Sequence, residues 1–488
     1  MTVLRARHAA HLAAGGLFVV AAEALALPVA FVLAAFLTRK LGPPGYGLFA
    51  LASALVAWIE WTVGSMLSRA IVREASVAGH DARVASAALQ LNLLVGGGAM
   101  SLLWLVAPSV GWLVGEPALV SPLRVLSLDI PIFAATMAHR SLMIGAGEYR
   151  SRAVLPVVRW LARLTLVVAF VASGWSLNGA IAGCLLASLA ELIAARIAIR
   201  PRLFNRPGAV LGRLLGDALP FLALGLTLRL FDRIDLLMFK ALGGSIAEAG
   251  VYGAAQNVAM SLSVISVAVP PLLLATLTRL NVSGEERAAA AIASDALRVV
   301  AWLLPLAGIA YGAGPQIATW LFGPAFESGG ALLGPLIVTA IAQIAVAVVI
   351  MTLSAAGTPN AFLGPAAAML GFAVAAGVIV IPRYGAAGAA GATCAAALVG
   401  AVWALRLAWS RASVSPPLAA VVRSALAAVA TAGVCRIAAP ALPLGVTVGI
   451  GAAVAAVVLQ VTGELRLSDL RRLPMWTAVP AALGEVES

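Results

Sequence analysis

The sequence has little charge and few polar stretches. Only 11% of its 488 residues are Asp, Glu, Lys or Arg, against about 25% in a typical soluble domain. Hydrophobic residues make up 62% of the chain, and the mean hydropathy is +1.03. Such a composition excludes a soluble globular protein. It predicts a polytopic membrane protein built entirely from α-helices.

Cysteine and histidine are also scarce. Cys184, Cys394 and Cys435 each lie alone in an apolar segment, without CxxC spacing or a neighbouring His. We therefore interpret them as small core residues and not as disulfide partners or metal ligands. The motifs GxxxxGK[ST], GxSxG and HExxH, which carry nucleotide binding, nucleophilic catalysis and zinc proteolysis, are absent from the sequence. We expect no enzyme activity, no metal and no cofactor.

A long polar loop is missing as well. Membrane-bound glycosyl transferases and polymerases need a sizeable extramembrane region to hold their catalytic groups. No segment between the apolar runs is long enough to form a soluble domain. The loop lengths therefore disfavour a membrane enzyme.

Apolar runs of about 20 residues, the length that crosses a bilayer, recur along the whole chain. The first run follows a basic start and continues to Leu37 without a plausible cleavage site. We therefore expect it to be a retained span and not a signal peptide. We predict fourteen spans, near residues 12–37, 47–67, 86–108, 121–144, 154–173, 177–199, 215–241, 250–277, 297–321, 331–355, 360–381, 385–409, 418–438 and 442–462.

The net charge of +12 and the pI of 10.8 are typical of proteins that bind nucleic acid. Here, however, the basic residues lie between apolar runs and form no single patch. They are concentrated in alternate connecting segments, beginning with the N-terminus. By the positive-inside rule, both termini are predicted to be cytoplasmic in a multi-pass protein that has no nucleic-acid partner.

The predicted span at 215–241 carries an unusual number of ionisable side chains. On an α-helix they fall within an arc of roughly 160°, so one side of the span faces protein or water. Charges at this depth are costly and mark either a functional cavity or a buried ion-pair cluster that joins helices. Both interpretations stay open. The residues are Asp217, Arg229, Asp232, Arg233, Asp235 and Lys240.

A turn motif occurs twice, after the first and after the seventh predicted span. Each copy has a basic residue, Leu-Gly, a short break, and Tyr-Gly opening the next apolar run, at 39–47 and at 240–253. The copies are six spans apart and so have the same orientation, which predicts a parallel repeat of two six-helix lobes around a central cavity. We assign the N-terminal lobe to residues 1–205, the C-terminal lobe to 206–412, and two further spans with a cytoplasmic tail to 413–488.

These motifs carry a family resemblance. The run LTRKLGPPGYGLFALASALVAW at 37–58, followed by LSRAIVRE at 67–74, resembles the opening of the polysaccharide-exporter (Wzx-type) flippases. The segment LRLFDRIDLLMFKALGGSIAEAGVYGAAQNVA at 228–259 resembles the start of their second half. This family belongs to the multidrug/oligosaccharidyl-lipid/polysaccharide (MOP) exporter superfamily. One departure is the inner loop 355–360, which lacks the basic residue that such proteins often carry.

The resemblance implies an alternating-access transporter in the bacterial inner membrane. Its cargo would be a lipid-linked oligosaccharide, and its partners would be membrane lipids, H⁺ or Na⁺, and a polysaccharide polymerase or ligase. A diphosphate on this cargo calls for Arg, whose planar fork of donors stays ionised. Arg159 lies close enough to the inner end of its span to snorkel instead. The candidate substrate-binding residues are Arg159, Arg163, Arg229 and Arg233.

Carboxylates inside the predicted spans are candidates for ion coupling or for lining the cavity. Glu23 precedes Pro28, which can bend the helix and free backbone carbonyls. Asp129 precedes Pro131 and could cap a helix break, and Glu23 could make a helix–helix hydrogen bond. For Glu60, between Ile59 and Trp61, a structural role stays equally open. The candidates are Glu23, Glu60, Asp129, Asp232 and Asp235.

Three other functions remain as alternatives. Two lie in the same superfamily: a flippase for lipid-linked peptidoglycan precursor, and a cation-coupled drug exporter. Arginines in mid-span disfavour cationic drugs as cargo, because such cargo prefers carboxylates alone. The third alternative belongs to another class, a membrane oligosaccharide polymerase or ligase.

Overall fold

The computed structural model describes residues 22–23, 25–78, 81–201, 212, 214, 230–231, 233–262, 273–274 and 276–464. Every regular element in these ranges is helical, which confirms the predicted all-α class. Parts of the predicted spans at 12–37, 215–241 and 250–277 lie outside the described residues. Nine described helical stretches are long and apolar enough to cross a membrane. The predicted count of fourteen spans stays a prediction.

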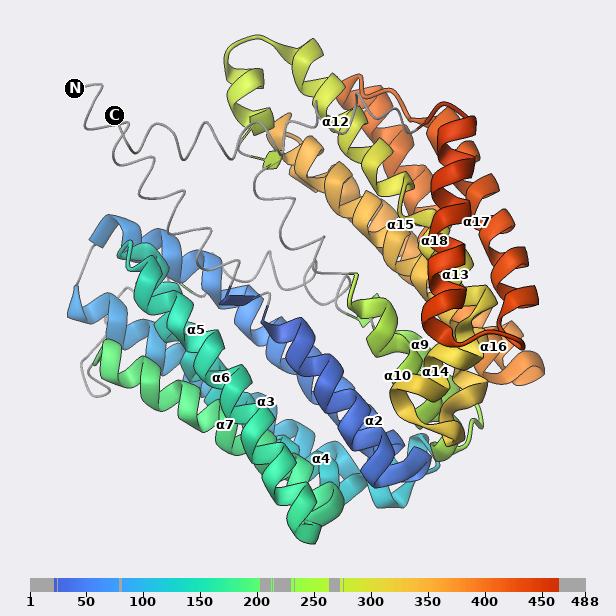
Figure 1. Ribbon diagram of the computed structural model, residues 1–488. Helices are drawn as coiled ribbons and strands as arrows, with labels where there is room; N and C mark the ends of the chain where they lie inside the picture. Colours follow the sequence, from blue (N-terminus) through green and yellow to red (C-terminus); the bar gives the residue numbers. More distant parts are fainter. Residues whose placement is uncertain are drawn as a thin grey trace, which may run out of the picture.

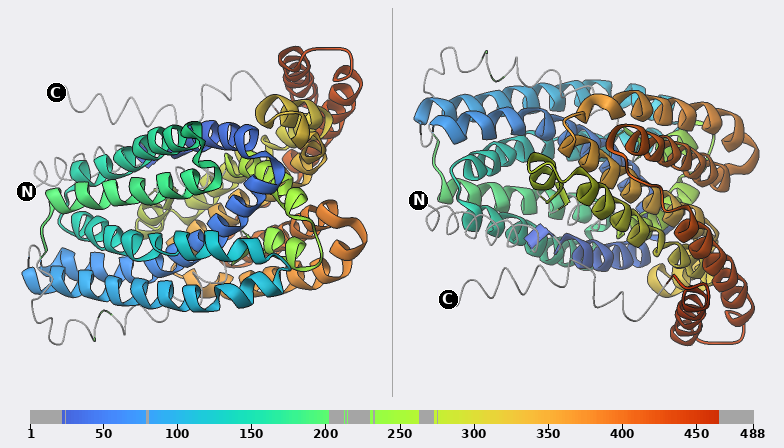
Figure 2. Two further views of the ribbon diagram at one scale, coloured as in Figure 1. Left: turned by 90° about the horizontal axis from the view of Figure 1, so that it is seen from below. Right: turned by 90° about the horizontal axis from the view of Figure 1, so that it is seen from above.

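The first half of the chain forms a group of helices that we call the N-terminal bundle. The helices α6 and α7 pair along their length, and α5 packs against α2, α3 and α7. In both views of Figure 2 the long helices of this bundle run roughly side by side. Its members are α2 (Ala26–Ala78), α3 (Ala82–Leu113), α4 (Val120–Leu126), α5 (Asp129–Gly145), α6 (Tyr149–Phe170) and α7 (Ser176–Ala198), with the 3₁₀ turn Pro117–Leu119 and the π turn Val171–Trp175.

The second half forms the C-terminal bundle, shown from green to red in Figure 1. Its central helix α15 packs against α10, α12, α13, α14 and α16. The members are α9 (Ile234–Ala241), α10 (Ile246–Met260), α12 (Glu286–Ala301), α13 (Leu304–Gly312), α14 (Gly314–Phe322), α15 (Gly330–Ala355), α16 (Leu363–Ala412), α17 (Leu418–Ala438) and α18 (Leu444–Val461), with the 3₁₀ turns Pro324–Gly329 and Pro359–Phe362.

Glycines divide the longest helices. The 53 residues of α2 would extend about 80 Å if straight, far more than the hydrocarbon core of about 30 Å. Its backbone leaves the helical conformation at Gly42, with φ 66° and ψ 176°. The 50 residues of α16 are interrupted in the same way at Gly385, with φ 56° and ψ −133°. Only glycine adopts these conformations at low cost, so each helix holds two of the predicted spans.

The two bundles meet where α2 turns beside α10 and α14 (Figure 1). A Cβ atom added at Gly47 would lie 2.1 Å from the carbonyl oxygen of Ile246. One added at Gly250 would lie 2.1 Å from the carbonyl oxygen of Pro43. Both glycines belong to the repeated turn motif. The contact between the bundles therefore requires glycine in both copies.

The last two helices pack firmly onto the C-terminal bundle. A Cβ atom at Gly308 of α13 would lie 2.2 Å from the carbonyl oxygen of Ala428 in α17. One turn later Gly312 approaches the carbonyl oxygen of Ala432 in the same way. Helix α18 then packs against α17 at the edge of the molecule (Figure 2). The boundary predicted at residue 413 therefore separates helices that are in close contact.

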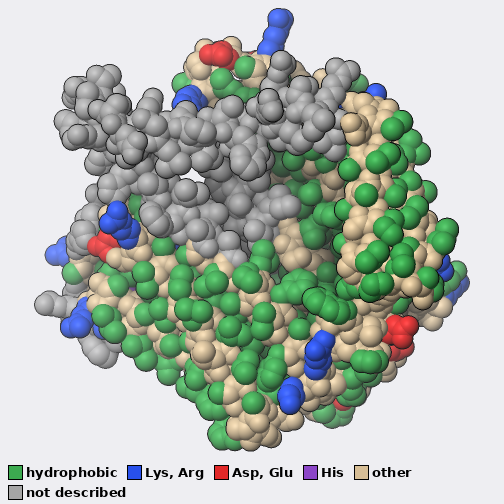
Figure 3. All heavy atoms as spheres, in the orientation of Figure 1, with side chains coloured by type: hydrophobic (Ala, Val, Ile, Leu, Met, Phe, Trp, Pro, Cys, Tyr) green, Lys and Arg blue, Asp and Glu red, His purple; other side chains and the backbone are tan. Residues whose placement is uncertain are grey.

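The outer surface is largely apolar. Figure 3 shows hydrophobic side chains spread over the described part of one face, with few charged side chains among them. Large side chains such as Leu102, Trp112, Ile197 and Val461 are more than half exposed. Such a surface suits lipid and not water. The chain is a multi-pass membrane protein.

Candidate functional site

A pocket of about 200 Å³ lies between the two bundles. The helices α2 and α6 of the N-terminal bundle line one side, and α10 and α14 of the C-terminal bundle line the other. Its wall is mostly apolar, with Arg233, Asn257 and Ser261 as polar exceptions. The lining residues are Ala26, Leu27, Ala30, Phe31, Ala34, Trp160, Arg233, Asn257, Val258, Met260, Ser261 and Phe322.

Arg233 is positioned by a chain of hydrogen bonds. Its Nη1 donates to Oε1 of Gln256 at 2.9 Å, and Nε2 of Gln256 donates to Oδ1 of Asp235 at 3.0 Å. The hydroxyl of Tyr252 donates to Oδ2 of Asp235 at 2.6 Å. Asp235 is 4% exposed, so its carboxylate is a buried anchor. The amide of Gln256 thus links this anchor to a guanidinium at the pocket wall.

The sequence of α10 produces this arrangement. Ser245 and Glu248 form a capping box that starts the helix, with the Ser245 hydroxyl accepting from the backbone N–H of Glu248. Tyr252 and Gln256 follow at steps of four residues and so lie on one helix face, toward α9. The interhelical role that amides usually have in membrane bundles applies here to Gln256.

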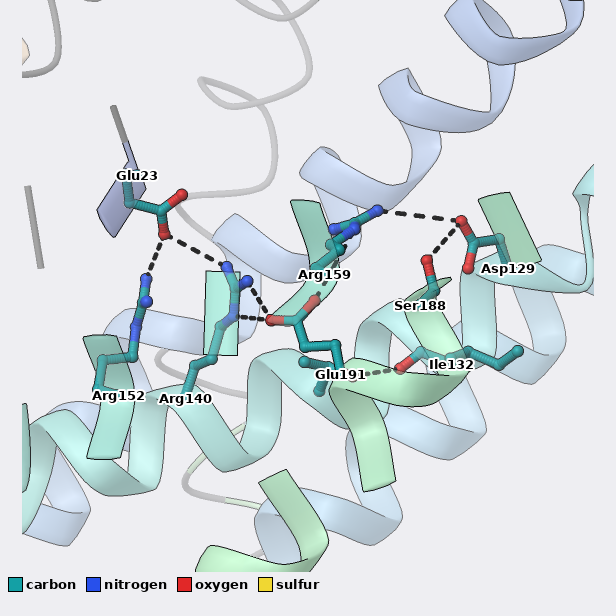
Figure 4. A network of polar contacts seen from close by, with 9 residues as sticks. Glu23, Asp129, Ile132, Arg140, Arg152, Arg159, Ser188 and Glu191 are labelled. Carbon is teal, nitrogen blue, oxygen red and sulfur yellow. Dashed lines mark hydrogen bonds and ion pairs between the residues drawn. The ribbon is translucent and has the colours of Figure 1, made fainter. Parts of the chain in front are cut away.

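A second polar cluster, which we call the arginine–carboxylate network, lies within the N-terminal bundle (Figure 4). Glu191 of α7 accepts from Nε of Arg140 at 2.8 Å and lies 3.8 Å from Nε of Arg159. Arg159 also lies 3.9 Å from Oδ2 of Asp129, which accepts from the Ser188 hydroxyl at 3.1 Å. The network connects α5, α6 and α7.

Glu23 and Glu60 extend this network at its two ends. Oε1 of Glu23 accepts from Nη2 of Arg152 at 2.8 Å and lies 3.5 Å from Nη1 of Arg140. Glu60 is buried near Asp129 and Arg159, whose charges act on its carboxyl group. Two buried carboxyl groups therefore adjoin one guanidinium at this end of the network, where a second negative charge beside the first is unfavourable.

The candidate residues from the sequence therefore divide into two groups. Glu23, Glu60, Asp129 and Arg159 meet in the arginine–carboxylate network. Arg233 and Asp235 lie in the C-terminal bundle, Arg233 at the pocket wall. Arg163 places its guanidinium 5.5 Å from the ring centre of Trp160, which lines the pocket. Arg229 and Asp232 lie outside the described residues.

Arg140 and Arg152 belong to the site but were not candidates from the sequence. They lie near the ends of their helices, and the positive-inside rule assigns them to positions beside cytoplasmic loops. The structure buries both, with 6% and 8% of their surface exposed. Helical spacing gives a signal for them, because Arg140 follows Asp129 by eleven residues and Arg152 precedes Arg159 by seven, so each pair shares a helix face.

Comparison with known proteins gives a consistent result. Residues 12–272, more than half of the chain, match the profile of a family described as polysaccharide biosynthesis protein. No curated protein sequence matches the chain.

Three solved structures illustrate the shared fold. Lipid II flippase MurJ in an inward closed conformation is 12% identical, with a TM-score of 0.73 over 88% of this chain and 96% of that one. An inward-facing multidrug resistance MATE transporter of the MOP superfamily is 17% identical, with a TM-score of 0.65 over 79% and 95%. A MOP superfamily transporter from Pyrococcus furiosus is 15% identical, with a TM-score of 0.56 over 82% and 96%.

Proposed function

This chain belongs to the polysaccharide biosynthesis protein family, and from that membership we propose that it is a lipid-linked oligosaccharide flippase. Its cargo is a polyprenyl-diphosphate-linked oligosaccharide, the precursor of a surface polysaccharide. The protein moves this cargo across the bacterial inner membrane, with both of its own termini in the cytoplasm. The apolar surface and the flippase-like fold support this proposal.

One observation carries the proposal most directly: Arg233 lies at the wall of a pocket between the bundles. A guanidinium offers several donors to phosphate oxygens, and the bond to Gln256 limits its motion before cargo arrives. A volume of about 200 Å³ suits a diphosphate better than a whole oligosaccharide. The bundles must therefore separate to admit the sugars.

We propose that this separation is alternating access between two six-helix lobes, with α17 and α18 added to the second. The close contact at Gly47 and Gly250 joins the bundles beside the turn between the first two predicted spans, and the predicted topology assigns that turn to the outer face. Nζ of Lys240 donates to the carbonyl oxygen of Val114 at 3.1 Å and lies 3.6 Å from Glu116, which adds a second contact there. These contacts would break when the outer mouth opens.

Ion coupling is the remaining part of the proposal. Glu60 and Asp129 are suited to hold a proton, since both carboxyl groups are buried and each acts electrostatically on the other. Glu23, Asp232 and Asp235 are the other candidates for H⁺ or Na⁺. A polysaccharide polymerase or ligase would consume the translocated cargo.

The test is translocation in proteoliposomes. Purified protein is reconstituted with a fluorescent polyprenyl-diphosphate oligosaccharide, and exchange between leaflets is measured by protection from an external quencher. We expect Arg233→Ala to slow exchange at least tenfold, because the cargo phosphate loses a charge-assisted partner. The control is Arg124→Ala, whose guanidinium lies 4.4 Å from the Trp104 ring centre, away from the pocket. Equal exchange in both variants would contradict the role of Arg233.

Lipid-linked peptidoglycan precursor is a second candidate cargo, and the similarity of the fold to lipid II flippase MurJ favours it. The same vesicles distinguish the cargoes, because the true cargo should exchange faster than the other at equal concentration. Efflux of small cationic dyes without lipid exchange would instead indicate a drug exporter. Growth of the oligosaccharide chain would indicate a polymerase.

A further inference from the structure

Glu23 places its carboxylate between two buried arginines at the edge of the arginine–carboxylate network (Figure 4). The single oxygen Oε1 contacts both of them, Arg152 at 2.8 Å and Arg140 at 3.5 Å. In Figure 4 the second oxygen of Glu23 points away from both guanidinium groups. One carboxylate oxygen therefore serves a pair of cations, and a ligand with more acceptor oxygens would satisfy more of their donors.

The two arginines differ in what else holds them. Arg140 has a second partner in Glu191, so its charge stays compensated if Glu23 leaves. Arg152 is 8% exposed, and Glu23 is its ion-pair partner within the described residues. In the same part of the chain its Nε and Nη1 have no hydrogen-bond acceptor. Buried donors without acceptors are costly, so Arg152 is poised for further anionic oxygens.

Glu23 is also the accessible member of the network. Its side chain is 30% exposed, whereas those of Glu191 and Asp129 are 1% and 8% exposed. It lies three and four residues before the pocket-lining Ala26 and Leu27 in the sequence. Of these three carboxylates, Glu23 is therefore the one that an approaching anion can reach.

We propose that Arg140 and Arg152 form a second anion site, which takes the diphosphate group of the cargo and which Glu23 occupies when cargo is absent. This inference rests on the proposed function. Cargo phosphate displaces the Glu23 carboxylate and gains the unused donors of Arg152. The displacement also breaks the ion pair between Glu23, which precedes α2, and Arg152 of α6, so binding at this site loosens a contact of the N-terminal bundle.

The test is binding of inorganic pyrophosphate to the purified full-length protein in phosphatidylcholine nanodiscs, measured by isothermal titration calorimetry. We expect Glu23→Gln to tighten binding about tenfold, since it removes the competing charge and keeps the shape of the side chain. Arg152→Gln added to it should abolish the gain. The matched control Glu327→Gln removes an exposed carboxylate far from the network in sequence and should leave affinity unchanged.

A structural ion pair gives the opposite result. If Glu23 only stabilises the bundle, Glu23→Gln lowers or preserves affinity, and either result overturns the proposal. If the double variant fails to fold, the variant Glu23→Gln with Arg152→Lys takes its place. It keeps the positive charge but loses the two-pronged guanidinium. If it retained the full gain in pyrophosphate affinity, that result would count against the site.

Two further arms identify the ligand and separate this inference from the proposed function. Farnesyl diphosphate should bind the Glu23→Gln protein as tightly as pyrophosphate does. Phosphatidylglycerol added to the nanodiscs should not compete with this binding. Competition would assign the site to lipid head groups and overturn the cargo assignment. The gain should persist in Arg233→Gln, which removes the pocket arginine. A gain in affinity without any lipid exchange in vesicles would keep the anion site and reject the flippase.

Discussion

Different interactions hold the helices together inside each of the two bundles. In the N-terminal bundle, α5, α6 and α7 meet through buried ion pairs centred on Arg140, Arg159 and Glu191. In the C-terminal bundle, α13 and α17 meet through glycines that bring one backbone against the other, as at Gly308 and Ala428. The first contact also includes Gly183 of α7, where an added Cβ atom would lie 2.7 Å from the backbone of Val167 in α6. It therefore combines charge with close packing, whereas the second depends on the absence of side chains.

This difference has a mechanical consequence. An ion-pair network has several arrangements of partners, so an added anion or proton can shift it from one to another. Close backbone packing has one arrangement and resists deformation. We infer that the N-terminal bundle senses cargo and ions, while α13, α15 and α17 move together as a rigid body.

Removing Glu191, the centre of the arginine–carboxylate network, should have the largest effect on the free energy of unfolding. Glu191→Ala leaves Arg140 and Arg159 buried beside weaker partners, and the loss of one side of a buried ion pair costs about 3–5 kcal/mol. The free energy of unfolding, from SDS titration followed by circular dichroism, should fall by that amount. Ser188→Ala is the control, because it removes one hydrogen bond to Asp129 and should cost about 1 kcal/mol. Equal losses would show that charge does not hold this bundle.

A methyl group should be enough to disturb the C-terminal bundle. Gly308→Ala places a Cβ atom where only 2.2 Å separates it from the Ala428 oxygen, so α13 and α17 must move apart. Overpacking of this kind costs about 1–3 kcal/mol. The control Gly433→Ala adds the same methyl on α17 in open space and should be neutral or slightly stabilising. The same SDS titration measures both, and a neutral Gly308→Ala would contradict the rigid packing.

Much of the fold was predictable from the sequence because membrane helices carry strong local signals. The glycines that divide α2 and α16 lie in Gly- and Pro-containing turns between apolar runs, and these turns marked the span boundaries. The repeated motif also indicated which glycines matter. The contact of Gly47 with α10 and of Gly250 with α2 was not predictable, since no local pattern says which turn meets which.

The site was predictable only in part. Mid-span charges such as Arg159 and Asp129 were identified because hydrocarbon makes them costly wherever they lie. Arg152 was missed because a basic residue near a helix end normally reaches the interface. Its ion pair requires Glu23, which precedes α2, to lie against α6, and this is a tertiary contact between residues 129 positions apart.

The smallest effect on stability is expected at Glu464, a charged residue that follows the end of α18 in the C-terminal bundle. Its carboxylate accepts hydrogen bonds from Arg298, Arg423 and Trp302 and so ties α18 to α12 and α17. Burial acts to raise the pKa of Glu464, but the bonds from the two arginines and the indole outweigh it, and the pKa lies below its ordinary value of 4.5. The contribution to stability is therefore complete above pH 4.5 and is lost as the pH falls through the lowered pKa.

Glu464→Gln removes this contribution, so its effect should depend on pH. The melting temperature of the variant should lie a few degrees below that of the natural protein at pH 7, and the gap should narrow as the pH is lowered through 4.5. Differential scanning fluorimetry at a series of pH values measures the gap, with the exposed Glu327→Gln as the control for loss of charge. A difference in melting temperature that stays constant with pH would mean that packing, and not charge, holds α18 in place. The C-terminal bundle would then depend on packing up to the end of the described chain.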